Sequence, residues 1–243
     1  MMGEQNKAAQ RGNPSFVWRE GQVRRLEMIR QGAQERMQGR VFEVGCGLGQ
    51  YLQRIQPEAA LAVGLDVEHD RLQKALSGSD GVLLALGEYL PLNENEFDLV
   101  LCNEVLEHVE DDRCTVNEMV RVLKPGGRLI VFVPNRGYPF ETHGIYRKGQ
   151  YHFGNKFAVN YLPRRWRDRL APHVRVYARR DLQALFAGLP VRFIQRTVIF
   201  GGYDNIVRRL GVVGKMIRWL LQTLEKTPLR VLGLSHLWVV EKI

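Results

Sequence analysis

A short β-branched and aromatic run, interrupted by Glu43 and followed by three closely spaced glycines, constrains the fold of this chain more than any other feature. The run is Val41–Val44, and Gly45, Gly47 and Gly49 follow it. Glycine lets the backbone turn tightly and approach a ligand, because it has no Cβ atom to collide. A second apolar run then ends in Asp66, whose carboxylate can accept hydrogen bonds from both hydroxyls of a ribose. This order of strand, glycine loop, helix, strand and acid predicts a nucleotide-binding half of a doubly wound α/β sheet.

The spacing of the glycines separates this loop from the common dinucleotide-binding fingerprint. The pattern G-x-G-x-x-G would need glycine at position 50, where the chain has Gln50. The pattern present is Glu43-x-Gly-x-Gly-x-Gly49. Taken alone, it is also compatible with a tight strand-to-helix turn that binds no ligand. Asp66 and the segments that follow make a ligand-binding loop the stronger interpretation.

Predicted strands and helices alternate along the first half of the chain, and the alternation then stops. Apolar runs predict strands at 41–44, 61–65, 82–85, 97–102 and 128–133, and helical patterns mark 16–36, 49–55, 69–77 and 112–122. The alternation implies parallel strands with right-handed crossovers. A tight turn is predicted at Lys124–Gly127, before the fifth strand. Beyond Pro134 the sequence predicts an irregular stretch at 135–178, a helix at 179–187 and two strands at 191–200 and 236–242.

Cysteine content and hydropathy predict a cytoplasmic protein. The three cysteines are too few, and odd in number, for a disulfide framework, so we expect reduced thiols. No apolar run reaches the roughly 18 residues of a membrane span. The polar start, Met1–Lys7, lacks the apolar core of a signal peptide. Peripheral attachment to a membrane stays open.

Charge is distributed unevenly between the two halves of the chain. Residues 1–134 carry 15 Lys/Arg and 20 Asp/Glu, whereas residues 135–243 carry 20 Lys/Arg and 6 Asp/Glu. The second half is therefore strongly basic and is predicted to meet something anionic. A membrane surface, an acidic substrate and a nucleic acid are the three kinds of partner that this charge suits.

Residues 38–134 resemble the cofactor-binding core of class I S-adenosylmethionine (SAM)-dependent methyltransferases. The glycine motif, Leu90–Glu110 and Met119–Ile130 carry this resemblance, which includes some likeness to ubiquinone O-methyltransferases. It implies a Rossmann-like seven-stranded sheet of order 3-2-1-4-5-7-6 with strand 7 antiparallel, the two late strands being strands 6 and 7. Three regions follow: an N-terminal tail and helix at 1–37, a SAM-binding core at 38–134, and at 135–243 a substrate lid with strands 6 and 7 and a basic helix.

The resemblance also implies roles in SAM binding for individual residues. Glu43 would lie near the amino group, Asp66 would bind the ribose hydroxyls, and Val67 would pack on the adenine. Asn103 would face the methyl group. The loop residues that would line the methionine and ribose are Gly45, Cys46, Gly47 and Gly49. One departure is Leu86, where many members have an aspartate for the adenine amino group, so main-chain groups of Leu86 and Gly87, or Glu88, must take that role.

Methyl transfer from SAM is an in-line displacement, in which alignment supplies much of the acceleration. A base is needed only if the acceptor must lose a proton. We expect the acceptor-binding residues in the irregular stretch, at the carboxyl ends of the strands. His143, flanked by Glu141, is the strongest candidate there, and His108 is the second catalytic candidate. The weaker candidates are His152, Tyr138, Tyr146 and Tyr151; the alternative is a lid whose aromatic side chains only pack.

The motif Glu104-x-x-Glu107-His108 has two interpretations. Spacings of three and four would place these side chains on one helical face, where carboxylates and imidazole can bind a divalent metal. A similar motif occurs in small-RNA 2′-O-methyltransferases and ubiquinone O-methyltransferases, where it is tied to metal-assisted methylation, and His143 could complete such a site. The alternative, which we favour, is that these side chains cap a helix or line the pocket without a metal.

A basic amphipathic segment follows at Asn205–Lys226. Its apolar residues recur at helical spacing, and they are Ile206, Leu210, Val213, Ile217, Leu220, Leu221 and Leu224. Basic residues decorate it at Arg208, Arg209, Lys215 and Arg218, and Trp219 suits an interface. Such a helix can lie on anionic lipid. The slightly favoured alternative is a helix packed on the sheet with a solvated basic face.

These features predict an enzyme that transfers a methyl group from SAM to a small-molecule or lipid-like acceptor, at oxygen. Nucleic acid is disfavoured, because strand 4 ends in Cys102-Asn-Glu-Val105 and not in the Asn/Asp-Pro-Pro-Tyr/Phe motif of enzymes that methylate amino groups of nucleic acids. An RNA 2′-O-methyltransferase remains the alternative enzyme. A SAM-binding or membrane-associated relative without catalysis is the alternative outside enzymes.

Overall fold

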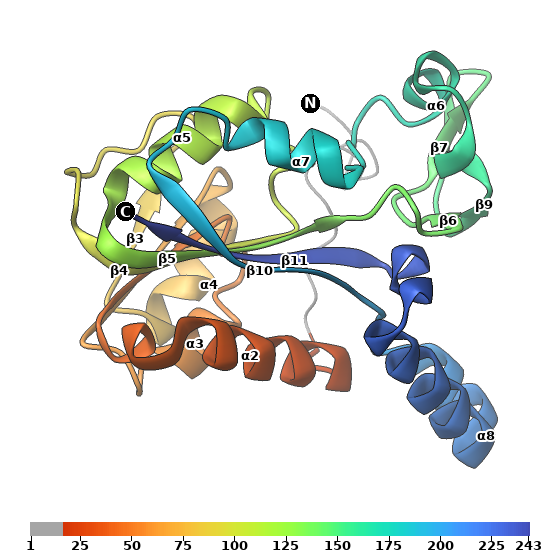
Figure 1. Ribbon diagram of the computed structural model, residues 1–243, viewed down its shortest axis with the longest axis horizontal. Coiled ribbons are helices and arrows are strands. Elements are labelled where there is room, and N and C mark those ends of the chain that lie inside the picture. Colours follow the sequence, from red (N-terminus) through yellow and green to blue (C-terminus); the bar gives the residue numbers. More distant parts are fainter. Residues whose placement is uncertain (1–16) are drawn as a thin grey trace.

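Seven strands form one mixed sheet in the order β10-β11-β5-β4-β1-β2-β3 in the computed structural model, which describes residues 17–243 (Figure 1). The strands are β1 (Arg40–Val44), β2 (Leu61–Asp66), β3 (Gly81–Leu84), β4 (Phe97–Asn103), β5 (Leu123–Pro134), β10 (Val191–Ile199) and β11 (Ser235–Lys242). Strands β1 to β5 pair in parallel, and β11 is antiparallel to both β5 and β10. This confirms the predicted order, with β10 and β11 as strands 6 and 7.

Helices cover both faces of the sheet (Figure 1). One face carries α2 (Glu20–Ala33), α3 (Leu52–Ile55) and α4 (His69–Ala75), and the other carries α5 (Asp112–Val122) and α7 (Arg179–Leu185). Short 3₁₀ turns, η1 (Gln34–Gln38) and η2 (Leu76–Gly78), extend α2 and α4. The helix predicted from residue 16 thus begins at Glu20, and residue 16 and the tail before it lie outside the described residues.

Alternate residues of each central strand enter two different cores, because successive side chains of a strand point to opposite faces. On β1, Val41 belongs to the same core as Ile29 of α2, whereas Phe42 belongs to the same core as Met119 of α5. Strand β5 is buried on both faces, as its continuous apolar run predicts. The turn predicted at Lys124–Gly127 lies inside β5, where the pairing with β4 skips from Leu123 to Arg128.

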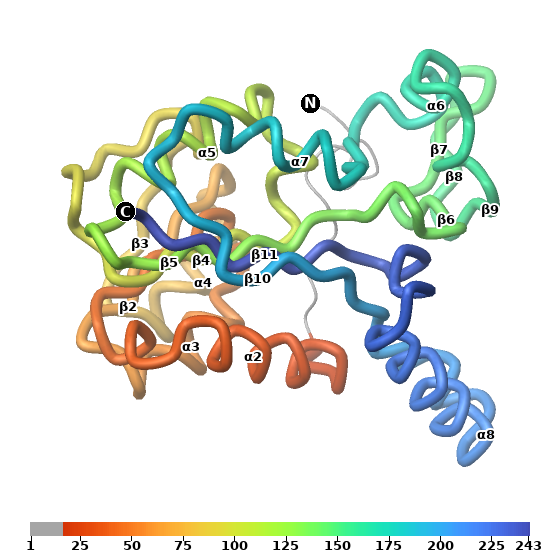
Figure 2. Tube along the Cα trace, in the orientation of Figure 1, coloured from red at the N-terminus to blue at the C-terminus, as the bar shows by residue number. Residues whose placement is uncertain are grey.

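The irregular stretch after β5 folds into a small insertion beyond the carboxyl end of that strand (Figures 1 and 2). Two short ladders form it, in which β6 (Phe140–Glu141) pairs with β9 (Lys156–Phe157) and β7 (Ile145–Arg147) pairs with β8 (Gln150–His152). A 3₁₀ turn, η3 (Val159–Tyr161), and α6 (Arg164–Leu170) complete it. We call residues 135–178 the insertion from here on.

The basic segment near the C-terminus is a helical hairpin, α8 (Asp204–Thr223), that projects from the body of the protein (Figures 1 and 2). The chain reverses at Gly211, whose φ of 54° and ψ of −121° are not helical. The two limbs meet at buried Gly214, where a Cβ atom would lie 2.7 Å from the carbonyl oxygen of Ile206. The favoured expectation of one helix packed on the sheet is therefore wrong. Turns η4 (Leu224–Lys226) and η5 (Pro228–Leu232) lead back to β11.

All three cysteines are free thiols, as expected, and Cys46 and Cys102 are buried. Within residues 17–243, no helix combines the length and the apolar character needed to cross a bilayer.

Candidate functional site

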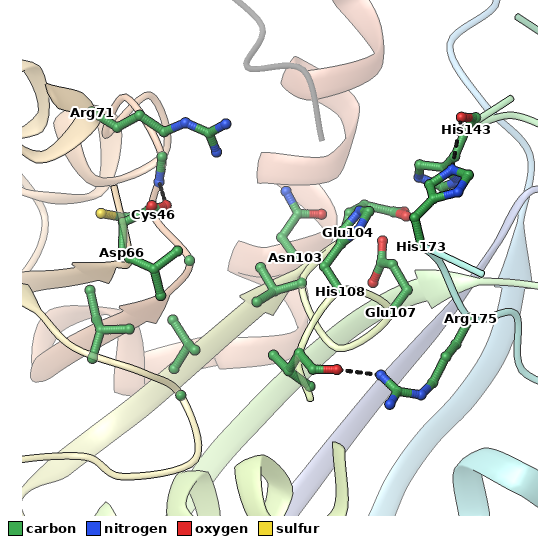
Figure 3. Close-up of a pocket in the computed structure, with 18 of the residues that line it drawn as sticks. Cys46, Asp66, Arg71, Asn103, Glu104, Glu107, His108, His143, His173 and Arg175 are labelled. Atoms are coloured by element: carbon green, nitrogen blue, oxygen red, sulfur yellow. Dashed lines mark hydrogen bonds between the residues drawn. The ribbon is translucent and has the colours of Figure 1, made fainter. Parts of the chain in front are cut away.

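A cleft of about 1260 Å³ opens at the carboxyl ends of β1, β2 and β4 and extends to the insertion (Figure 3). Strands β1 and β4 are neighbours in the sheet, and the chain leaves them on opposite sides. In open α/β sheets such a switch point is where ligands bind. The cleft therefore has a glycine-loop end and an insertion end.

The three glycines of the loop have different structural roles. Gly45, Gly47 and Gly49 all have positive φ, between 55° and 72°. A Cβ atom at Gly47 would meet nothing within 4 Å, so its main chain borders the open cleft. At Gly45 a Cβ atom would collide with Val105. Gly49 differs from the prediction: it is not in the cleft wall, and a Cβ atom there would lie 2.8 Å from Ala75 of α4. Its place is in helix packing.

Asp66 holds the glycine loop and the end of β2 together. Its Oδ2 accepts the N–H of Gly47 at 2.9 Å, and its Oδ1 accepts the N–H of Glu68 at 2.9 Å. The side chain is buried in the cleft wall, with Cys46 beside it (Figure 3). The next residue, Val67, lines the cleft too. Val67 is 39% exposed, so it offers an apolar surface next to the carboxylate.

Glu43 presents an unsatisfied oxygen at the glycine-loop end. Its side chain is buried, and Oε2 has no hydrogen-bond partner in the described part of the chain. Burial raises the pKa of this carboxyl well above its usual value, against the opposing hydrogen bond from the backbone of Leu52. Buried polar atoms are normally paired, so an orphaned carboxylate oxygen in a cleft wall indicates a cationic or hydrogen-bonding ligand.

The loop after β3 supplies the far wall of this end. Leu86, 52% exposed, and Gly87 line the cleft as predicted. Glu88 lines the cleft too, and its Oε1 accepts the N–H of Glu110 at 2.8 Å and that of Asp111 at 3.3 Å. Main-chain groups of Leu86 and Gly87, or the other oxygen of Glu88, are the candidates for binding adenine.

Asn103, at the end of β4, is held by an arginine that sequence reasoning missed. Nη1 of Arg25 donates to Oδ1 of Asn103 at 2.6 Å. Its Nη2 donates to Oε1 of Glu104 at 2.7 Å and to Oγ of Ser235 at 2.9 Å. Burial alone would raise the pKa of Glu104, but Arg25 and Ser235 hold it below the usual value. No sequence signal distinguishes Arg25 from the other basic residues of α2.

The segment from Glu104 to His108 is a turn, so the expectation of one helical face is wrong. Glu104 has a φ of 57°, which ends β4 and reverses the chain, and the N–H of His108 then donates to the carbonyl of Val105 at 2.9 Å. Glu107 and His108 nevertheless reach the cleft. One ligand atom each of Glu107, His108 and His143 lies within 4.8 Å of the others (Figure 3).

These three side chains form what we call the acceptor cluster. Both carboxylate oxygens of buried Glu107, and Nδ1 of His108, have no hydrogen-bond partner among the described residues. Burial raises the pKa of Glu107 well above its usual value, and nearby Glu104 raises it further. Burial lowers the pKa of His108 to about 4, and His143 lowers it as well. The cluster thus offers a neutral imidazole and an unsatisfied carboxyl to the cleft.

His143 is oriented by a buried pair in the insertion. The main-chain N–H of His143 donates to Oε1 of Glu141 at 2.9 Å, and the ring nitrogen Nδ1 of His143 lies 3.1 Å from the same oxygen. Oε2 of Glu141 accepts from Nη2 of Arg167 at 2.5 Å. Burial would raise the pKa of Glu141, but the hydrogen bond with His143 and the charge of Arg167 lower it to about 2. Sequence reasoning missed Arg167, which lies 26 residues further along the chain.

The other candidates of the insertion divide into two groups. Tyr146 and Tyr151 line the cleft, and the hydroxyl of Tyr151 donates to the carbonyl of His143 at 2.5 Å. His173, which was not predicted, lines it too (Figure 3). His152 and Tyr138 do not line the cleft, and Tyr138 instead borders a smaller cavity behind it.

Comparison with known proteins finds similarity over the cofactor-binding part of the chain. Residues 42–131 match the family model described as a methyltransferase domain. An uncharacterized protein of Methanocaldococcus jannaschii is 34% identical over 98 residues, which are 40% of this chain and 46% of the relative. The ubiquinone biosynthesis O-methyltransferase of Erwinia tasmaniensis is 34% identical over 119 residues, 46% of this chain and 49% of the relative. The chain thus spans about half the length of these curated relatives.

Solved structures share the fold over nearly the whole chain. An S-adenosylmethionine-dependent methyltransferase from Mesorhizobium loti has a TM-score of 0.63 at 18% identity, over 89% of this chain and 96% of that one. The N-methyltransferase NodS from Bradyrhizobium japonicum, in complex with S-adenosyl-L-homocysteine, has a TM-score of 0.57 at 16% identity, over 98% and 97%. The [4+2]-cyclase SpnF has a TM-score of 0.60 at 16% identity, over 95% and 85%.

The residues present at the glycine-loop end fit SAM. The orphaned oxygen of Glu43 suits an amino group, and Asp66 suits ribose hydroxyls. The main chain at Gly47 leaves room for a ligand to lie against it. Residues 42–131 match the methyltransferase-domain family model, and the chain shares the fold of solved SAM-dependent methyltransferases.

Proposed function

We propose that the protein transfers a methyl group from SAM to an oxygen of a small-molecule or lipid-like acceptor. One observation carries this proposal: a single cleft joins Glu43 and Asp66 at one end to the acceptor cluster at the other. The names of the relatives add support, because ubiquinone biosynthesis O-methyltransferases are among them.

The glycine-loop end of the cleft would bind and orient SAM. When bound, SAM supplies a methyl group activated by a sulfonium. Glu43 would receive the amino group, Asp66 would receive the ribose hydroxyls, and the ligand would lie against the main chain of Gly47. Asn103, fixed by Arg25, would face the methyl end. Because the displacement is in-line, this fixed orientation supplies much of the acceleration.

The insertion end of the cleft accepts the proton that the acceptor hydroxyl loses. A hydroxyl oxygen that gains a methyl group must lose its proton, and a positioned imidazole is the usual acceptor. Nδ1 of His143 is engaged by Glu141, so Nε2 is the nitrogen that takes the proton. Glu141 fixes the ring and offsets the positive charge that develops on it, as the acid of a catalytic triad does. Arg167 in turn fixes Glu141.

The acceptor cluster also suits a divalent cation. One carboxylate and two imidazoles are donors that several divalent metals accept, and His143 has a carboxylate on its other nitrogen, as metal-bound histidines commonly do. Glu107, His108 and Nε2 of His143 would hold the ion, and His143 would then be a ligand and would not take the proton. When bound, it would polarise the acceptor oxygen and favour loss of the proton.

Transfer of label from methyl-labelled SAM tests the proposal. Wild-type protein is incubated separately with a total lipid extract, a water-soluble metabolite extract and total RNA, with and without EDTA. We expect label in the lipid or metabolite fraction, in a product that resists mild alkali, as a methyl ether does and a methyl ester does not. Loss of transfer in EDTA, restored by added Mg²⁺ or Zn²⁺, assigns a cation to the acceptor cluster.

Two variants locate the chemistry. His143→Ala should lower kcat about 10²–10⁴-fold while SAM affinity is retained, because a general base acts on the chemical step. His152→Ala is the matched control: it lies in the same insertion but outside the cleft, and it should leave kcat unchanged. Label in RNA alone would show that the acceptor is RNA and not a small molecule or lipid. No label in any fraction despite tight SAM binding would contradict the proposal.

A further inference from the structure

The hairpin α8 exposes large apolar side chains that the rest of the protein leaves uncovered. The exposed residues are Leu210 (51%), Val212 (81%), Val213 (53%), Met216 (62%), Trp219 (66%) and Leu220 (55%). Val212 adjoins the reversal at Gly211, so the most exposed of these side chains lies at the tip of the hairpin. Contiguous exposed apolar surface marks a site of interaction with a partner or a membrane.

The charged residues of the projecting part of the hairpin are all basic, and the acidic residues lie at its base. Between residues 205 and 224 there are four basic residues and no acidic one. Among residues 17–243, Arg208, Arg209, Lys215 and Arg218 form no ion pair. The flanking acids face the body instead: Asp204 accepts the N–H of Gly21 at 3.4 Å, and Glu225 pairs with Arg24 at 2.6 Å. The base of the hairpin is therefore anchored, while its projecting part is apolar and purely cationic.

We infer that the hairpin inserts its apolar tip into the interface of a bilayer that contains anionic lipids. An apolar face with flanking Lys and Arg is the arrangement by which helices lie in the headgroup region. Each basic residue near such a surface adds attraction, and tryptophan is enriched at this level of the membrane. An anionic lipid surface satisfies both features at once, because it accepts apolar side chains of any arrangement and supplies negative charge beside them.

The insertion lies at the same end of the longest axis as α8 (Figures 1 and 2). It exposes its own aromatic side chains, Phe153 (67%), Phe157 (71%) and Trp166 (49%), and the last follows Arg164 and Arg165. Phe153 also lines the cleft. Docking through α8 thus brings the insertion end of the cleft toward the bilayer. Resting on the proposed function, this assigns the acceptor to hydroxyl compounds that are embedded in a membrane.

Vesicle flotation with the full chain tests the docking. The vesicles contain phosphatidylcholine alone, or equal parts of phosphatidylcholine and phosphatidylglycerol. Wild-type protein should float with the anionic vesicles only, and added salt should weaken the binding because it screens charge. The double variant Met216→Glu/Trp219→Glu should bind at least about tenfold more weakly, because charged side chains resist transfer to the interface. Leu76→Glu, at a 55% exposed apolar residue of η2, is the matched control and should float normally.

Two further measurements support the test. One checks that the double variant is still folded, and the other tests whether the basic residues contribute to docking. Calorimetry with SAM should give the same affinity for the double variant as for wild type, since the hairpin does not line the cleft. A variant with Arg208, Arg209, Lys215 and Arg218 changed to Gln should also lose flotation, by about fivefold for each charge. Flotation that is absent for wild type, or unaffected by both sets of changes, would overturn the inference. So would sedimentation showing that wild type is a dimer and the double variant a monomer.

The acceptor assignment has its own measurement. Labelled SAM is supplied with a total lipid extract, either reconstituted in anionic vesicles or dispersed in detergent. The double variant should lose label transfer into the vesicles but keep it in detergent. Equal transfer into both would refute the assignment of a membrane-embedded acceptor. If wild type floats but transfers no label in either form, the proposed function fails while the docking stands.

Discussion

The main-chain N–H of Gly47 donates to Oδ2 of Asp66 over 2.9 Å, so the glycine loop and the end of β2 form one unit. The two groups are 19 residues apart in the sequence, and the parallel pairing of β1 with β2 brings them together. Asp66 is thereby placed to do two things. It orders the glycine loop, and it presents a carboxylate at the place where we propose that the ribose hydroxyls bind.

Replacing Asp66 by alanine should weaken SAM binding by about 10–100-fold, because hydrogen bonds to a charged group each contribute about 1.5–3 kcal/mol. Isothermal titration calorimetry measures the change. Asp70→Ala is the control, since that carboxylate is 97% exposed on α4 and away from the cleft. Unchanged affinity in Asp66→Ala, in a protein that still unfolds cooperatively, would remove Asp66 from the cofactor site.

Gly47→Ala should mainly weaken SAM binding, whereas Gly49→Ala should mainly lower the stability of the fold. Both positions have positive φ, so each alanine costs about 1–2 kcal/mol of stability. A Cβ atom at Gly47 would point into open space, whereas one at Gly49 would lie 2.8 Å from Ala75. We therefore expect Gly47→Ala to fold and to bind SAM poorly, and Gly49→Ala to lose more stability. Thermal unfolding and SAM titration measure the two effects, and a reversed pattern would refute the division of roles.

Arg25→Ala should lower the free energy of unfolding by about 2–3 kcal/mol, because it leaves the largely buried Glu104 carboxylate without its ion pair. Urea denaturation measures the change. Adding Glu104→Gln should recover part of the loss, since the unpaired charge is then removed. Arg30→Ala on the same helix is the control: its pair with Glu58 is exposed and contributes at most about 1 kcal/mol. Equal losses at both positions would argue against the buried network.

Stability should fall as the pH drops below neutrality, partly through His236. Nε2 of this buried residue lies 2.9 Å from the carbonyl of Tyr177. Burial lowers the pKa of His236, the Tyr177 carbonyl opposes this, and from α7 Arg179 lowers it while Asp181 raises it. A lowered folded-state pKa means that the contribution is complete above the unfolded value of about 6.5 and is lost as the pH falls through the folded value.

Urea unfolding at a series of pH values between about 7.5 and 5 checks this expectation, because one proton accounts for a slope of at most about 1.4 kcal/mol per pH unit. His236→Gln should flatten part of the slope. A slope that His236→Gln leaves unchanged would show that the ring does not titrate with unfolding.

Local patterns in the sequence were sufficient for the sheet and for the glycine-loop end of the cleft. Glu43, Gly47 and Asp66 lie at the ends of strands, and the side-chain and glycine requirements there are set by a few neighbouring residues. The strands themselves were predictable because β1, β4 and β5 are buried and rich in β-branched, aromatic and other apolar residues, with an uninterrupted apolar run in β5.

The insertion end was less predictable, because its contacts join distant positions. Arg25 reaches Asn103 across 78 residues, and Arg167 reaches Glu141 across 26. Neither arginine belongs to a pattern that marks it in advance. The turn after β4 was mistaken for a helix because its spacing suits one, while the positive φ of Glu104 cannot be read from the residue type. The reversal in α8 did leave a signal: Gly211 and Gly214 interrupt the segment, and glycine weakens a helix.

The central claim is that the cleft binds SAM with its ribose at Asp66 and its methyl group toward the acceptor cluster. A crystal structure of the complex with S-adenosylhomocysteine tests it most directly. The account predicts both ribose hydroxyls within hydrogen-bonding distance of the Asp66 carboxylate, the amino group at Glu43, and the open side of the sulfur facing His143. A nucleoside bound elsewhere, or a sulfur turned away from the insertion, would contradict it.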